Sequence, residues 1–129
     1  MNFKESIEIL KSWIQEDKKI VIFTGAGIST ASGIPDFRGK NGLYKKKGSI
    51  SPEEVLSHHY FISHPESFYQ FLKQEMLYPN AVPNKAHFWI SSLEKEHEVT
   101  VITQNIDCFH QKAGSSYVLE LHGNIHEYY

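Results

Sequence analysis

The sequence is poor in cysteine, in net charge and in long apolar runs, and each shortage excludes a class of protein. Its 129 residues include a single cysteine, Cys108, which excludes an internal disulfide and a thiolate zinc site within the chain. No apolar stretch approaches the roughly 20 residues of a membrane helix, and the first residues lack a signal-peptide pattern. The net charge of -2 indicates no nucleic-acid surface, and the basic run at 45–47 is typical of a solvated loop. We therefore expect a cytoplasmic protein without nucleic-acid or membrane partners, and we assign Cys108 no chemistry.

An apolar run followed by glycines predicts a binding site for a phosphate group. Residues 20–23 are rich in β-branched side chains and suit a short, fully buried parallel strand. Gly25 and Gly27 follow; without Cβ atoms they let backbone N–H groups approach an anion, and the next residues suit a helix N-terminus. Because residue 30 is threonine, the usual G-x-G-x-x-G fingerprint is incomplete, and no P-loop lysine follows. The alternative to a pyrophosphate cradle is a purely structural tight turn.

The next loop carries three side chains of different chemistry between two glycines. Asp36, Phe37 and Arg38 lie between Gly33 and Gly39. A loop of this composition beside a phosphate cradle predicts a mobile lid that covers a bound nucleotide. The alternative is a surface loop in which Asp36 and Arg38 form a local ion pair.

Two further strands, predicted at 99–103 and 117–121, are followed by polar residues at their carboxyl ends, where open α/β sheets bind ligands. Residues 104–107 follow the first of them, and an amide with a carboxylate can match the NH2 and C=O of a carboxamide. Asp107 has an alternative role as the cap of a helix over 107–113. His122 follows the last strand, and because a neutral imidazole accepts a proton near neutral pH we predict it to be the general base.

Helical patterns fill the remaining segments. Residues 3–16 carry one apolar stripe, which should pack on the first strand. Ser51 with Pro52 and Glu54 marks a helix start with a capping box, and residues 63–66 mark another. Asn84 caps a further helix whose inner face is predicted to be Trp89, Ile90 and Leu93. His87, at its third position, is interpreted as a half-buried histidine that donates to the backbone.

Taken together, these segments resemble the sirtuins, the NAD-dependent protein deacylases. The matching segments, in the family's order and spacing, are Gly25–Ser29, Gly33–Gly39, Pro83–His87, Thr103–Asp107 with His110 and Ala113-Gly114, and Glu120–Gly123. The resemblance implies an α/β fold with a Rossmann-like parallel sheet and a helical small-domain insertion. It makes residues 1–129 a partial catalytic domain, with the insertion at about 40–95.

The resemblance also implies NAD as cofactor and an acyl-lysine protein or peptide as substrate. In the implied mechanism the acyl-lysine oxygen attacks C1′ of the nicotinamide ribose, nicotinamide leaves, and His122 as base lets the acyl group move to ADP-ribose. The cofactor-binding residues carried over from the family are Gly25, Ala26, Gly27 and Thr30 at the phosphates, Asp36, Phe37 and Arg38 in the lid, Gln104 at the ribose, Asn105, Ile106 and Asp107 at the carboxamide, and His122.

The sequence departs from the family pattern after His122. It ends seven residues later, where sirtuins continue into four zinc-binding cysteines and the second half of the sheet. We therefore expect a fold truncated before the zinc module, with zinc expected only for the full-length family and its cysteine ligands absent here. The eight histidines do not supply a convincing metal site in their place. We expect weak or no deacylase activity from this chain alone.

Two other functions stay open. An NAD glycohydrolase or an ADP-ribosyl-transferring enzyme would use the same pocket without acyl-lysine, and a non-catalytic fragment would bind no NAD. Sirtuins that prefer acidic acyl groups carry a tyrosine followed three residues later by arginine, whereas here Tyr69 is followed by Leu72. Without that cation we expect a neutral acyl group such as acetyl.

Overall fold

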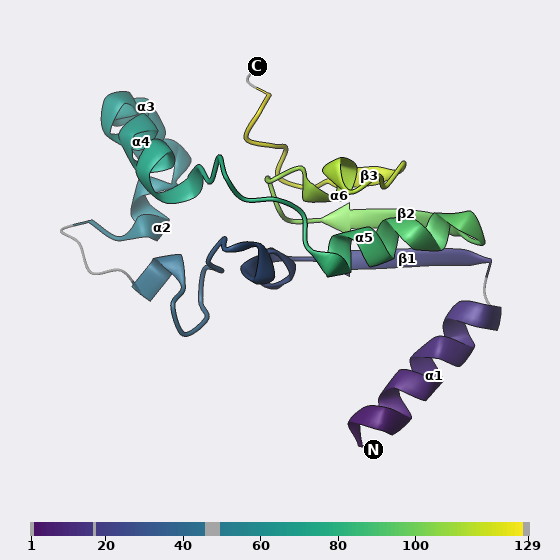
Figure 1. The fold of residues 1–129 in the computed structure, drawn as a ribbon. Helices are drawn as coiled ribbons and strands as arrows, with labels where there is room; N and C mark the ends of the chain where they lie inside the picture. Colours follow the sequence, from purple (N-terminus) through teal and green to yellow (C-terminus); the bar gives the residue numbers. More distant parts are fainter. Residues whose placement is uncertain (1, 17, 46–49, 128–129) are drawn as a thin grey trace. The chain divides into compact units, whose positions relative to one another are not determined.

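The computed structural model describes residues 2–16, 18–45 and 50–127, which form two compact units (Figure 1). The first unit comprises residues 1–25 and 83–129, and the second comprises residues 26–82. The division falls immediately after Gly25, so the predicted cofactor-binding residues are shared between the units.

The first unit contains a parallel sheet of three strands in the order β1-β2-β3. The strands are β1 (Lys19–Thr24), β2 (Glu98–Thr103) and β3 (Val118–Glu120). In the register, Thr24 lies opposite Thr103, and Thr103 lies opposite Glu120. The carboxyl ends of all three strands therefore lie at one edge of the sheet, as expected from the sequence.

The two faces of this sheet differ in burial. Val99 and Val101 are buried, and their neighbours at Ile20 and Ile22 are half-buried. The opposite face stays open, since Val21 is 66% exposed and Phe23 63% exposed. The prediction of a fully buried first strand was therefore wrong: the strand is parallel, but only one of its faces is covered.

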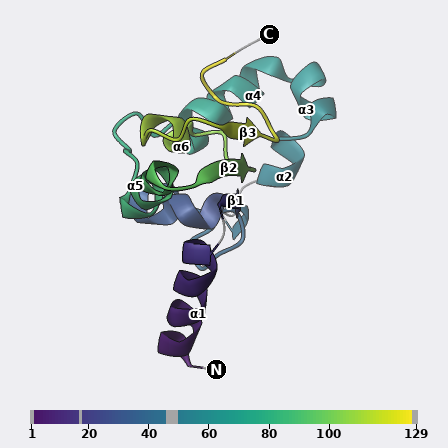
Figure 2. The same cartoon turned by 90° about the vertical axis from the view of Figure 1, so that its right-hand side faces the viewer.

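Two helices cover the buried face. They are α5 (Lys85–Ser92) and α6 (Phe109–Lys112), which contact each other and lie on the same side of the sheet (Figures 1 and 2). Ile90 and Phe109 are the large apolar side chains that these helices bury. Trp89, predicted to face inward, is 47% exposed, because the inner face of α5 is set by His87 and Ile90, three residues apart.

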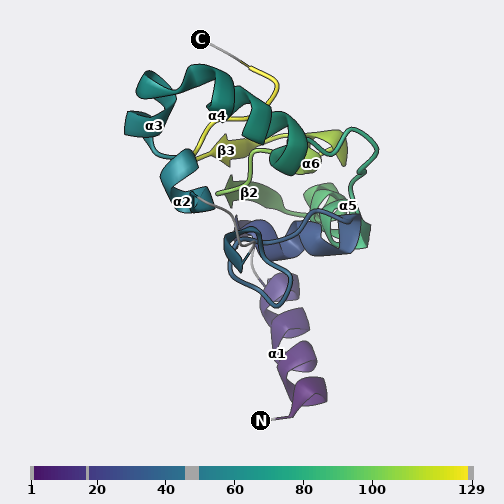
Figure 3. The same ribbon diagram turned by 90° about the vertical axis from the view of Figure 1, so that its left-hand side faces the viewer.

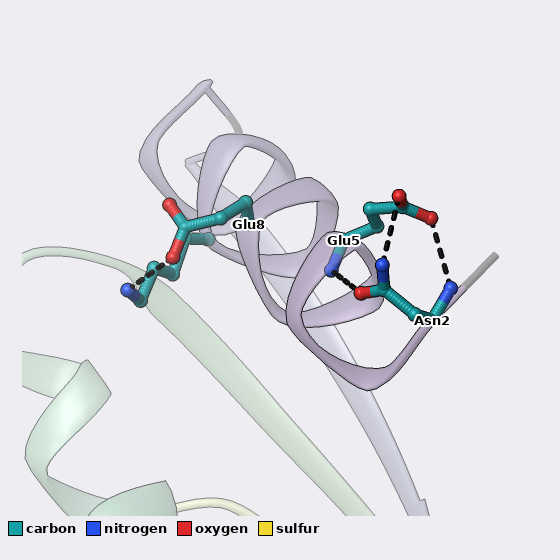
Figure 4. A network of polar contacts seen from close by, with 4 residues as sticks. Asn2, Glu5 and Glu8 are labelled. Carbon is teal, nitrogen blue, oxygen red and sulfur yellow. Dashed lines mark hydrogen bonds and ion pairs between the residues drawn. The ribbon is translucent and has the colours of Figure 1, made fainter.

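The N-terminal helix α1 (Phe3–Glu16) has the predicted bounds and begins with a reciprocal cap (Figure 4). The side chain of Asn2 accepts from Glu5 N at 3.0 Å, and Glu5 Oε2 accepts from Asn2 N at 2.8 Å. No residue of α1 is buried, and Phe3 is 81% exposed. The expected packing of its apolar stripe on the first strand is therefore not found.

The described residues of the second unit form helices and loops without a strand. The elements are the 3₁₀ helices η1 (Ala26–Ser32) and η2 (Leu43–Lys45), the α-helices α2 (Pro52–Val55), α3 (His58–Ser63) and α4 (Pro65–Phe71), and a π-helical turn, η3 (Leu72–Met76). Helices α3 and α4 lie side by side (Figure 3), and Phe61 of α3 meets Phe68 of α4 at a ring distance of 4.9 Å.

The helix starts of the second unit agree in part with those predicted from the sequence. Ser51 caps α2 as predicted, accepting from Glu54 N at 3.2 Å. The next helix, α3, has Ser57 as its cap and was not predicted, and α4 begins at Pro65 without a side-chain cap. Residues 46 and 47 of the basic run lie outside the described residues.

Candidate functional site

Backbone hydrogen bonds draw the three strand ends of the first unit together. Gln104 N donates to Thr24 O at 3.0 Å, and Leu121 N donates to Thr103 O at 2.9 Å. Beyond the strands, Ile125 N donates to Ile106 O at 2.9 Å, so the loop after β3 runs beside the loop after β2. The segments that carry Gly25, residues 104–107 and His122 therefore meet at one edge of the sheet.

Gly25 is held closely by the loop that follows β2. Its carbonyl accepts from Asn105 Nδ2 at 3.1 Å. A Cβ atom at Gly25 would lie 3.4 Å from Gln104 Nε2, at the tight end of normal contact. Gly25 is not among the glycines with positive φ, which are Gly33, Gly114 and Gly123. Neither the backbone angle nor the contacts of Gly25 within the described residues therefore require a glycine at this position.

His122 is exposed and oriented by the same loop. Its Nδ1 lies 3.0 Å from Gln104 O. A carbonyl oxygen only accepts, so Nδ1 is the donor and carries the proton of the neutral ring. The lone pair then lies on Nε2, on the other side of the ring, which is the requirement for a general base at this position.

Asp107 contacts the start of the following helix but is not its cap residue. Its Oδ1 accepts from Phe109 N at 2.9 Å, the first residue of α6. The N-cap is Cys108, which has a φ of 59° and makes no side-chain cap bond. The helix predicted over 107–113 is therefore shorter and is not capped by Asp107, and the predicted contact of Asp107 with a carboxamide stays a prediction.

Four buried polar residues behind the strand ends were not recognised from the sequence as a group. Thr24 and Thr103 end their strands opposite each other, and His110 Nε2 lies 2.9 Å from Thr24 Oγ1. His87 is fully buried, with its ring centroid 4.9 Å from that of His110. Two strands that both end in threonine are the sequence signal that could have revealed the group.

The predicted environment of His87 was wrong. The residue is buried rather than half-buried, and its Nδ1 accepts from Asn84 N at 3.2 Å in a capping box instead of donating to the backbone. Burial lowers the pKa of His87, and burial together with nearby His87 lowers the pKa of His110 to about 4. Both rings are therefore neutral at pH 7.

Glu120, at the end of β3, connects the last strand to α6 and to the loop that carries His122. Its carboxylate accepts from Gln111 Nε2 at 2.8 Å and from Asn124 Nδ2 at 2.9 Å. Burial, and then the Glu120 carboxylate beside it, raises the pKa of the Cys108 thiol to about 11. The thiol is therefore protonated at neutral pH.

The predicted phosphate-binding residues of the second unit begin the 3₁₀ helix η1 instead of a regular α-helix. Thr30 Oγ1 donates to Gly27 O at 2.8 Å within this helix. A Cβ atom at Gly27 would meet nothing within 4 Å, so open space lies next to this backbone. That space is compatible with the predicted approach of a phosphate.

The predicted lid is a loop held by its own contacts. Asp36 Oδ1 accepts from Gly39 N at 2.8 Å, and the Arg38 guanidinium lies over the Tyr44 ring at 5.4 Å. The Phe37 and Tyr44 rings are 5.2 Å apart. The alternative of an ion pair between Asp36 and Arg38 was therefore wrong, because each of these groups has another partner.

The described ranges offer neither a metal site nor a membrane-spanning helix. Residues 2–16, 18–45 and 50–127 contain no group of three or more histidine, cysteine or acidic side chains placed to hold a metal ion. In the same ranges, no helix has the length and apolar character needed to cross a bilayer.

Comparisons with known proteins agree with one another. The model of the Sir2 family matches residues 25–129. The NAD-dependent protein deacetylase of Listeria monocytogenes is 50% identical over 120 residues, which is 93% of this chain and 52% of that protein. The NAD-dependent protein deacetylase of Thermotoga maritima is 50% identical over 132 residues, covering 100% of this chain and 50% of that protein. The chain thus spans about half the length of the curated relatives it matches.

Solved structures give the same result for the fold. A structure on the mechanism and regulation of Sir2 enzymes superposes with a TM-score of 0.85 at 45% identity, covering 95% of this chain and 48% of that one. A Sir2 structure with a deacetylated p53 peptide and 3′-O-acetyl ADP ribose has a TM-score of 0.78 at 47% identity, covering 97% and 48% of the two chains. The α/β fold with a Rossmann-like parallel sheet is confirmed.

Proposed function

The chain belongs to the Sir2 family, and we propose on this basis that the protein is an NAD-dependent protein lysine deacylase. The substrates are NAD and an acyl-lysine protein or peptide, and the products are free lysine, nicotinamide and O-acyl-ADP-ribose. This chain contributes the nicotinamide and ribose end of the site and the general base. Its own turnover is expected to be weak or absent.

The polar groups at the strand ends suit a nicotinamide carboxamide. Asn105 offers an amide and Asp107 a carboxylate, which together supply a donor and acceptors for NH2 and C=O. Gln104 is assigned to the ribose, and Ile106 lies between these polar residues. NAD supplies a ribose carbon from which nicotinamide can leave. The residues assigned to its phosphates are Gly25, Ala26, Gly27 and Thr30, and those assigned to cover it are Asp36, Phe37 and Arg38.

His122 is proposed to remove a proton from a ribose hydroxyl after nicotinamide has left. Its Nδ1 is engaged by Gln104 O at 3.0 Å, which leaves the Nε2 lone pair to accept. A general base of this kind typically contributes a factor of roughly 10² to 10⁴ in rate. The single cysteine of this chain does not make up the four-cysteine set that the resemblance implies for zinc, and no step is derived through that metal.

One observation carries the proposal: three parallel strands end together and place Gly25, Asn105 and His122 on adjoining segments. A carboxamide pocket and a base next to one another are what the reaction needs. Family membership alone would not show that this chain keeps both.

The test combines NAD binding with product analysis. The chain is mixed with NAD and an acetyl-lysine peptide, binding is followed by calorimetry, and products are identified by mass spectrometry. NAD binding that is lost in Asn105→Ala, with any product being O-acetyl-ADP-ribose, supports the proposal. Nicotinamide release at the same rate without peptide would identify an NAD glycohydrolase. Absence of NAD binding would identify a non-catalytic fragment.

The same proposal includes a preference for neutral acyl groups and a cytoplasmic location. Tyr69 lies on α4 and Leu72 follows that helix, so no cation stands at the third position after the tyrosine. We expect acetyl-lysine peptides to be preferred over succinyl-lysine peptides, and Leu72→Arg to reduce the difference. Competition between the two peptides measures the preference, and equal use of both would contradict it.

Cell fractionation tests the proposed cytoplasmic location.

A further inference from the structure

We infer that Thr24, Thr103, His87 and His110 form a positioning cluster that holds Asn105 and Gly25 in the geometry needed to bind nicotinamide. The four residues are called the Thr-His cluster below. The inference rests on the proposed function, because it assigns nicotinamide binding to Asn105. It assigns a role in this binding to residues of two helices and two strand ends that do not themselves touch the ligand.

The cluster is polar and almost fully buried. Thr24 is 7% exposed, Thr103 3%, His110 1% and His87 0%. Burying such groups costs free energy unless they are hydrogen-bonded, and an apolar side chain would fill each position at lower cost. Four polar residues gathered behind the strand ends therefore indicate a requirement other than stability.

A series of hydrogen bonds connects the Thr-His cluster to Asn105 and Gly25. Thr24 Oγ1 donates to Thr103 Oγ1 at 2.9 Å, and Thr103 Oγ1 also accepts from Asn105 N at 3.1 Å. The Asn105 side chain then reaches across to Gly25 O at 3.1 Å, next to Thr24. The backbone and the side chain of Asn105 are thus both held by the ends of β1 and β2.

The same bonds select one tautomer for each histidine. Because the Thr24 hydroxyl proton goes to Thr103, Thr24 Oγ1 accepts from His110, so the His110 proton lies on Nε2. His87 Nδ1 accepts from Asn84 N, so the His87 proton also lies on Nε2. The direction is the one assigned to the two hydroxyls, and it makes His110 Nε2 the donor to Thr24.

Two buried ring nitrogens without a hydrogen-bond partner complete the pattern. They are His87 Nε2 and His110 Nδ1. In the tautomers derived above, the first is a donor and the second an acceptor, on rings whose centroids are 4.9 Å apart. The pair is therefore complementary in its donor and acceptor roles. The reverse direction would leave two donors unpartnered, which is less favourable.

The cluster makes the placement of Asn105 depend on α5 and α6. Asn84 and His87 start α5, His110 lies in α6, and the threonines end the strands. Loss of the Thr103 hydroxyl removes the acceptor of Asn105 N, and loss of Thr24 or His110 removes a buried hydrogen bond that holds Thr24 and Thr103 in place. His87 supports the cluster through its ring contact with His110. We expect loss of these contacts to weaken nicotinamide and NAD binding while the sheet stays formed.

The first test needs no ligand. Imidazole nitrogens of the chain labelled with ¹⁵N are observed by NMR at pH 7, and both His87 and His110 should show the Nε2–H tautomer. In Thr103→Val, which keeps the shape and removes the hydroxyl that accepts from Asn105 N, amide exchange at Asn105 should accelerate about tenfold. An Nδ1–H tautomer at His110, or unchanged exchange at Asn105, would overturn the inference.

The second test measures ligand affinity. Thr24→Val and His110→Phe should weaken nicotinamide and NAD binding about tenfold, and His110→Gln, which keeps an N–H donor, should recover part of the loss. Thr24→Ser keeps the hydroxyl and should bind as wild type. Thr100→Val is the matched control, since Thr100 lies on the same strand β2 but on its other face.

The two proposals fail in different ways. If wild type binds no NAD, the proposed function fails, while the tautomers and the exchange at Asn105 still decide whether the cluster positions that residue. If wild type binds NAD and Thr24→Val binds equally well, the positioning role is wrong and the proposed function stands. A variant that loses its fold is replaced by Thr103→Val, which removes the acceptor of Asn105 N.

Discussion

At the scale of single residues, His122 differs in environment and in chemical role from His87 and His110. His122 is exposed and oriented through one nitrogen, which leaves the other to accept a proton. His87 and His110 are buried and neutral, and they act only through hydrogen bonds. The same side chain therefore supplies a base at the surface of the site and a fixed donor behind it.

Replacing His122 by alanine should separate the two stages of the proposed reaction. Acyl transfer should fall roughly 10²- to 10⁴-fold because its base is removed, while exchange of labelled nicotinamide into NAD should persist. Rapid-quench analysis of both products measures the two rates. Since His122 is exposed, stability should change by less than about 0.5 kcal/mol.

The control for this variant is His59→Asn, at an exposed histidine of α3. It should leave both rates unchanged. Equal losses of nicotinamide exchange and acyl transfer in His122→Ala would show that His122 binds NAD instead of acting as the base.

Acid should destabilise the protein through His110. Its pKa in the folded chain is lowered to about 4 from 6.5, so between these values the unfolded chain binds a proton that the folded chain does not. The stabilisation is complete above about pH 6.5 and is lost as the pH falls toward 4. The loss amounts to at most about 3 kcal/mol, and His87, whose pKa is also lowered, adds in the same direction.

Urea unfolding at pH 7, 5.5 and 4.5 measures this loss. His87 and Asp107 are the titratable groups that act on His110, the first lowering its pKa and the second raising it. His110→Gln has no proton to gain, so its stability should fall less over the same range. Parallel curves for wild type and His110→Gln would contradict the assignment.

At the scale of elements, the helix starts show which local rules act alone and which depend on packing. Ser51 caps α2 as its sequence predicts, because the cap involves only neighbouring residues. Asn84 also caps α5, but the third residue of that helix, His87, is buried and turned back to Asn84 N. That second contact depends on the sheet beneath the helix.

Removal of the α5 cap should destabilise the first unit. Asn84 Oδ1 accepts from Ala86 N at 2.9 Å, so Asn84→Ala should cost about 1 kcal/mol, within the range of 0.5 to 2 measured for such caps. Asn84→Asp keeps the acceptor and should recover most of the loss. Denaturant unfolding gives the three values.

Asn80→Ala is the matched control, because Asn80 is exposed in a turn. A loss of stability in Asn80→Ala as large as in Asn84→Ala would show that the effect is not capping.

At the scale of the whole molecule, the open face of the sheet is the largest departure from an ordinary globular domain. Val21, Phe23 and Leu119 lie on this face and are exposed, whereas Val101 on the other face is fully buried. An apolar sheet face left open favours association with another surface.

Polar substitution on the open face should reduce self-association. Val21→Lys with Phe23→Thr should lower the weight-average mass at high concentration, because exposed apolar area is removed, and stability should change by less than about 0.5 kcal/mol. Sedimentation equilibrium and urea unfolding make the measurements. Val101→Ala, on the buried face, should instead cost about 2 kcal/mol. Equal costs on the two faces would contradict the assigned burial.

The sequence by itself determined the elements and the residues that lie next to strand ends. Strand periodicity, glycine turns and the order of polar residues are local properties, so the three parallel strands and the placement of Gln104, Asn105 and His122 were predictable. The sequence also placed Asp107 next to a helix start, where its carboxylate accepts from Phe109 N, although the cap residue itself is Cys108.

Only the tertiary structure decided which polar residues are buried and which apolar ones are not. Thr24 and His110 are 86 positions apart, and their 2.9 Å contact exists because β1, β2 and α6 pack together. Phe23 looks as suited to a core as Ile22, yet it is 63% exposed because it lies on the opposite face of β1 from Ile22. Burial depends on what lies opposite a side chain, which is a non-local property that no short segment of sequence contains.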